Sequence, residues 1–109
     1  MSLKTQFSNA QLQRINMQSI LYLCSCPSQV SMQVDSLRKL YDYQINCADQ
    51  DRTELQNAVH QRIAEAAIKA HKIMEDCLLE VMQLEGWDPV TLKMPDNLRK
   101  MLESEIKCG

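Results

Sequence analysis

Thiol and imidazole side chains are the groups in this chain whose spacing most suggests a shared site. Cys24 and Cys26 form a Cys-x-Cys pair, and His71 lies in a later segment with helical periodicity. In an antiparallel hairpin that turns near residues 47–51, facing positions add up to about 98, which places both cysteines opposite residues 71–74. Thiolate and imidazole together are ligands for zinc or another soft metal. We therefore predict Cys24, Cys26 and His71 as candidate metal ligands.

The same cysteines also fit a purely structural role. Paired zinc ligands usually have two to four residues between them, and Cys24 and Cys26 have one. Cys77 lies about 120° around the helix from His71, so one ion would hardly reach both. A buried cysteine commonly behaves as a small apolar residue. No cofactor is therefore required, and a metal or thiol-redox site is the alternative reading.

The two histidines lie eleven residues apart, hence on nearly the same side of one helix. They could form a pH-sensitive contact across an interface. The plainer interpretation is a partly buried histidine hydrogen-bonded to a neighbour. Glu75 follows His71 by one turn and could orient its ring or form an exposed ion pair.

Several motifs of enzymes are missing from the sequence. It contains neither the Glu-x-x-His pairs of di-iron bundles nor His-Glu-x-x-His. The two glycines, Gly86 and Gly109, cannot form a phosphate-binding loop. Nothing marks the serines, histidines and aspartates as a triad. We expect no enzymatic activity.

The element that must position these groups is a long helix, expected at residues 51–85. Its first apolar row recurs at steps of three and four and consists of Leu55, Val59, Ile63, Ala66, Ala70, Ile73, Cys77, Val81 and Leu84. A second apolar row beside it consists of Ala64, Ala67, Met74, Leu78 and Met82. A surface helix needs an apolar stripe of only about 100°. This helix must therefore pack against more than one neighbour.

The ends of the helices are marked by capping residues. Asp51 and Glu54 resemble a capping box, and Gly86 suits a left-handed cap on which Trp87 folds back. Ser8 and Gln11 predict an earlier helix start, with Phe7 packed on Leu12. We expect helices at about residues 8–25, 28–47, 51–85 and 95–106.

Pro27 separates the first two helices. The apolar rhythm continues across it, which favours a kinked rod of about 40 residues that matches the long helix. The alternative is a tight turn with Pro27 at the start of a new helix. The kinked rod would form a four-helix bundle with a second copy, whereas the turn would form a three-helix bundle with the last helix as a lid.

Composition limits the classes of function. The 109 residues suffice for one domain, and the net charge of −2 comes without a basic cluster, which argues against nucleic-acid binding. No run approaches the roughly 18 apolar residues of a membrane helix. Five scattered cysteines without a secretory signal suggest reduced thiols in the cytoplasm.

These patterns predict an all-α antiparallel helical hairpin that forms a four-helix bundle across a homodimer. The first helix carries little charge, which suits a face covered by a partner. The residues expected at the interface are Leu12, Ile15, Ser19, Leu23, Ala67, His71, Met74 and Leu78. We expect a non-enzymatic protein that acts through protein–protein interaction, as a regulator, adaptor or assembly factor. The sequence does not indicate its pathway or the identity of its partner.

Overall fold

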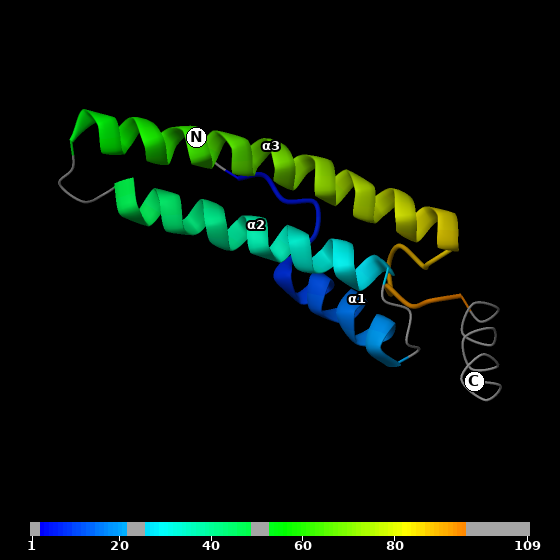
Figure 1. The fold of residues 1–109 in the computed structure, drawn as a ribbon. Helices are drawn as coiled ribbons and strands as arrows, with labels where there is room; N and C mark the ends of the chain where they lie inside the picture. Colours follow the sequence, from blue (N-terminus) through cyan, green and yellow to red (C-terminus); the bar gives the residue numbers. More distant parts are fainter. Residues whose placement is uncertain (1–2, 22–25, 49–52, 96–109) are drawn as a thin grey trace.

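Three helices form the part of the chain that the computed structural model describes, namely residues 3–21, 26–48 and 53–95. They are α1 (Asn9–Leu21), α2 (Cys26–Ala48) and α3 (Glu54–Glu85). Figure 1 shows α2 and α3 side by side and antiparallel, with the shorter α1 against α2. The expectation of an all-α fold is confirmed. The expected helix at 95–106 lies almost entirely outside the described residues.

The ends of α3 follow ordinary capping chemistry, shifted at the start by a few residues. Thr53, and not Asp51, is the N-cap, and it forms a reciprocal capping box with Gln56. At the other end Gly86 has a left-handed φ of 81°, as expected. The Trp87 amide then donates to the Met82 carbonyl at 2.9 Å, so the chain folds back and Trp87 becomes buried.

The chain reverses direction between α1 and α2, so the kinked rod is wrong. Ser31 Oγ on α2 donates to the Leu12 carbonyl on α1, and Arg38 Nη1 reaches Asn9 Oδ1. The later residue of α2, Arg38, thus contacts the earlier residue of α1, Asn9. The two helices are therefore antiparallel. Pro27 lies in the first turn of α2, where its missing N–H leaves no helical bond unmade. The predicted alternative, a new helix that starts at the proline, is confirmed.

The core consists of two apolar clusters along the α2–α3 hairpin. The larger cluster, at the end where α1 packs, consists of Phe7, Leu12, Ile15, Val34, Leu78, Met82, Trp87, Leu92 and Met94. The smaller consists of Tyr41, Ala64 and Ala67, with Leu3, Ile45 and Ile68 against them. The first turns of α3, residues 54–59, are exposed. Core packing is therefore dense at one end of the hairpin and sparse at the other.

The described residues form an elongated molecule. The Cα radius of gyration is 17.5 Å, whereas a compact domain of this length has about 13 Å. Within these residues, no helix is both long and apolar enough to cross a membrane.

Candidate functional site

A buried polar network lies in the hairpin and is centred on Arg38 of α2. Its Nε donates to His71 Nε2 at 2.9 Å, and its Nη2 donates to Glu75 Oε2 at 2.9 Å. The side chains of Arg38 and Glu75 are 9% and 1% exposed. Two charges at this depth are tolerated because each one is paired and hydrogen-bonded.

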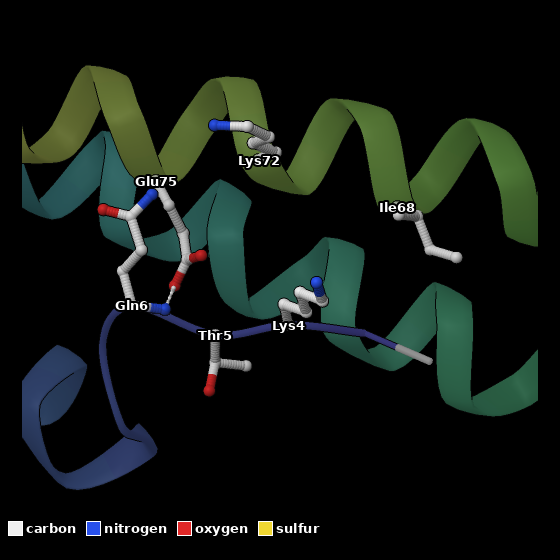
Figure 2. A pocket seen from close by; sticks show the side chains of 6 residues that line it. All are labelled: Lys4, Thr5, Gln6, Ile68, Lys72 and Glu75. Carbon is white, nitrogen blue, oxygen red and sulfur yellow. Dashed lines mark hydrogen bonds between the residues drawn. The ribbon is translucent and has the colours of Figure 1, made fainter. Parts of the chain in front are cut away.

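The network also holds the N-terminal segment, residues 3–8, against α3. Glu75 Oε2 accepts hydrogen bonds from the backbone amides of Gln6 and Phe7, at 2.8 and 3.0 Å. Arg38 Nη2 donates to the Phe7 carbonyl, and Arg38 Nη1 donates to Asn9 Oδ1. Figure 2 shows the bond from the Gln6 amide to Glu75. One carboxylate and one guanidinium therefore connect this segment, α1, α2 and α3.

The hydrogen bond that His71 Nε2 accepts from Arg38 suits a neutral imidazole ring. Burial lowers the pKa of His71 most strongly, and Arg38 lowers it further, while Glu75 acts in the opposite direction. Because Nε2 accepts from Arg38, the ring proton must sit on Nδ1. That atom faces Glu75 Oε1 at 3.5 Å and forms no hydrogen bond within the described residues. Only Nε2 of the His71 ring is therefore hydrogen-bonded within the network.

A cavity of about 370 Å³ lies between the N-terminal segment and α3. Figure 2 shows its lining, which consists of Lys4, Thr5, Gln6, Ile68, Lys72 and Glu75. Lys72 Nζ already pairs with Asp76 at 2.9 Å, and Glu75 Oε2 accepts three hydrogen bonds from protein groups. The Lys72 and Glu75 side chains of this cavity are therefore already engaged within the fold.

The candidate metal ligands are not brought together by the described residues. Cys24 lies outside them, and Cys26 is an exposed free thiol at the start of α2. His71 contacts Arg38, which is twelve residues, or about 18 Å of helix, beyond Cys26. The predicted register, with Cys26 opposite His71, is wrong because the hairpin pairs positions that add up to about 109, not 98. Within the described residues, no three potential ligands converge.

The residues predicted for a homodimer interface lie mostly inside the single chain. Leu12, Ile15, Ser19, Ala67, His71 and Leu78 are buried, and Met74 is half-buried. Leu23 lies outside the described residues. On the uncharged polar face of α1, Gln13 remains exposed and Asn16 and Gln18 are half-buried, so the chain's own helices cover only the side with Leu12, Ile15 and Ser19. A dimer of this fold would therefore need another surface.

The first apolar row of α3 provides such a surface. The second row faces α2 and is buried except for the half-buried Met74, and His71 and Glu75 are buried with it. The first row lies about 120° around the helix from it. Its larger side chains remain in solvent: Leu55 is 75% exposed, Val59 49%, Ile73 66% and Leu84 87%. Of the remaining members, Ala66 is exposed and the others are half-buried.

The polar network was only partly visible in the sequence. The spacing of His71 and Glu75 predicts either an oriented ring or an exposed ion pair, and it does not indicate Arg38 as a third member. Glu75 falls among Ala64, Ala67, Leu78 and Met82 on the helical wheel, and this position is the signal that a buried partner must exist. His60 fits the plainer interpretation, since its ring Nδ1 contacts Gln44 Oε1.

Comparisons with protein-family models, with curated proteins and with solved structures found no match for this chain.

Proposed function

We propose that this chain is a cytoplasmic, non-enzymatic protein that acts through protein–protein contact, as a regulator, adaptor or assembly factor. It would do so as a homodimer in which the α2–α3 hairpins of two copies form a four-helix bundle. The observation that carries the proposal is the exposed first apolar row of α3. Its apolar residues, in uninterrupted helical register, stay exposed or half-buried after the chain has formed its own core.

The size of this surface supports a functional contact. From Leu55 to Leu84 the row spans 29 residues, or about 44 Å of helix. With a width of about 10 Å it covers roughly 440 Å², which is in the range where the largest patch of a soluble protein is often functional. Burial on two copies would remove roughly 900 Å² from water, below the 1,200–2,000 Å² of tight complexes. A reversible dimer of micromolar affinity is therefore expected.

Substitution of an exposed member of the row tests this proposal. Ile73→Glu places a charge in the middle of the row, where a second copy would have to desolvate it. Sedimentation equilibrium should show a weakened or abolished dimer, while circular dichroism shows unchanged helix content. Met32→Glu on α2 is the matched control, because Met32 is 58% exposed and does not belong to the row.

The proposal fails if Ile73→Glu and Met32→Glu change self-association equally, or if the unaltered chain remains monomeric at every concentration tested.

A further inference from the structure

The first apolar row allows its own copy to pack against it, and the charges beside the row favour one orientation of that copy, an inference that rests on the proposed function. Counted from Ala70, its members lie at matching distances on both sides: Ala66 and Ile73 at four and three residues, Ile63 and Cys77 at seven, Val59 and Val81 at eleven, and Leu55 and Leu84 at fifteen and fourteen. A row with this property can meet its own copy in register in the antiparallel as well as the parallel orientation, so the charged side chains beside the row must decide between the two.

We propose that two copies of this chain pair through α3 in an antiparallel arrangement, with a two-fold axis near Ala70. A two-fold contact is isologous, so each residue of the row meets a residue of the same row. The small Ala66 and Ala70 lie at the crossing point, where they permit a close approach of the two helices. The larger side chains lie towards both ends.

The charges along the row favour the same orientation. Arg62 and Glu80 are 18 residues apart, which is five helical turns, so both lie on one edge of the row. Both are exposed, and neither forms an ion pair within the described residues. In the antiparallel dimer the same edges meet, and Arg62 lies within about 3 Å, along the axis, of the level of Glu80 in the second copy.

A parallel dimer would not produce these contacts. It would align each residue with its own copy, leaving Arg62 about 27 Å along the axis from Glu80 of the second chain. The antiparallel arrangement forms the ion pair twice, at the cost of bringing the two Lys69 side chains near each other beside the axis. Their ammonium groups can extend into solvent.

Charge reversal tests this arrangement without altering the core. Arg62→Glu alone and Glu80→Arg alone each create two like-charge contacts in the homodimer. Each should raise the dissociation constant about 10-fold, equivalent to about 1.4 kcal/mol. A mixture of the two variants should dimerise about as tightly as the unaltered chain, because an acidic side chain then faces a basic one at both sites of the mixed dimer. The chain that carries both substitutions should recover in the same way.

The control pair carries the same changes of charge away from the row. Arg14→Glu and Asp42→Arg lie on α1 and α2 and are exposed. Each alone should dimerise as the unaltered chain does, and their mixture should show no gain. If mixing Arg62→Glu with Glu80→Arg gives no tighter association than either variant alone, the antiparallel register is wrong.

The two proposals fail in different ways. If the unaltered chain dimerises and Ile73→Glu abolishes the dimer, but the charge variants have no effect, the interface stands and the register is wrong. If the unaltered chain is monomeric at every concentration, the homodimer itself is wrong.

Discussion

At the scale of single residues, the buried network decides how the described elements hold together. Arg38 reaches three other parts of the chain: the N-terminal segment, α1 and α3. Glu75 neutralises the charge of Arg38 and accepts hydrogen bonds from the backbone amides of Gln6 and Phe7. A buried ion pair often contributes no more to stability than equally packed apolar side chains would, because both charges are desolvated. Removal of one member is costly, because the other remains buried and charged.

Glu75→Gln should therefore be strongly destabilising. The amide keeps the size of the side chain but leaves Arg38 without its counter-charge, which typically costs about 3–5 kcal/mol. Urea denaturation measures this loss. Asp35→Asn is the matched control, since Asp35 forms an exposed ion pair with Lys39 and its loss should hardly move the midpoint. Equal midpoints for the two variants would contradict the role of the network.

His71 predicts a pH dependence of stability. Burial holds the pKa of His71 below its ordinary value of 6.5, so the unfolded chain binds the proton more readily than the folded one. The contribution of neutral His71 to the free energy of unfolding is complete above pH 6.5. It is lost as the pH falls below that value, by at most about 1.4 kcal/mol per pH unit. The groups that face the ring are Arg38 from α2 and Glu75 from α3.

Urea denaturation of the unaltered chain and of His71→Gln between about pH 6.5 and pH 5 measures this contribution. Gln can still accept a hydrogen bond from Arg38 but does not titrate. The free energy of unfolding should fall less steeply with acid in the variant. If the free energy of unfolding changed equally with pH in both proteins, the proton uptake of His71 would not differ between the folded and unfolded states.

At the scale of elements, capping residues fix where α3 begins and ends. Gly86 has a φ of 81°, and a Cβ there would meet Pro95 Cγ at 3.8 Å, an ordinary contact. Space is therefore available, and the cost of a side chain comes from the backbone conformation. Gly86→Ala should destabilise the fold by about 1 kcal/mol, and Gly86→Asn by less, because Asn tolerates this conformation better. Equal melting temperatures of Gly86→Ala and Gly86→Asn in thermal unfolding would refute this prediction.

The sequence predicted these elements better than their arrangement. Ser8, Gln11, Gly86 and Trp87 are local signals, and the structure confirms all of them. Pro27 was ambiguous, because continuous apolar periodicity fits both a kinked rod and two antiparallel helices. The reversal between α1 and α2 depends on tertiary contacts such as the hydrogen bond between their facing sides, which periodicity does not encode.

The choice of the buried face on α3 had the same limitation. Both apolar rows have helical spacing, and the sequence does not say which one α2 covers. The structure buries most of the second row, in which Ala64 and Ala67 pack with Tyr41 of α2. His71 and Glu75 lie on that face too, since Arg38 of α2 provides their partner. The candidate metal site was inferred from a pairing of α2 with α3 that is displaced by about three helical turns from the observed one. Local sequence patterns do not reveal this displacement.

At the scale of the whole molecule, the described chain is an elongated, three-helix assembly with an uncovered apolar surface. Its own core is concentrated where α1 packs, and the first apolar row of α3 extends along nearly the full length of the longest helix. A surface of this kind is costly in water and is stabilised by a partner helix. We therefore propose a second copy of this chain as the partner that covers this surface.

Native mass spectrometry of the reduced, unaltered chain over a concentration series from about 1 to 100 µM tests this claim most directly, since this range spans the micromolar affinities expected of a small interface. We expect a dimer without adduct, and the fraction of dimer should rise with concentration. A metal-bound mass that is lost in the Cys24→Ser/Cys26→Ser variant would favour the metal alternative. A monomer at every concentration would contradict the account.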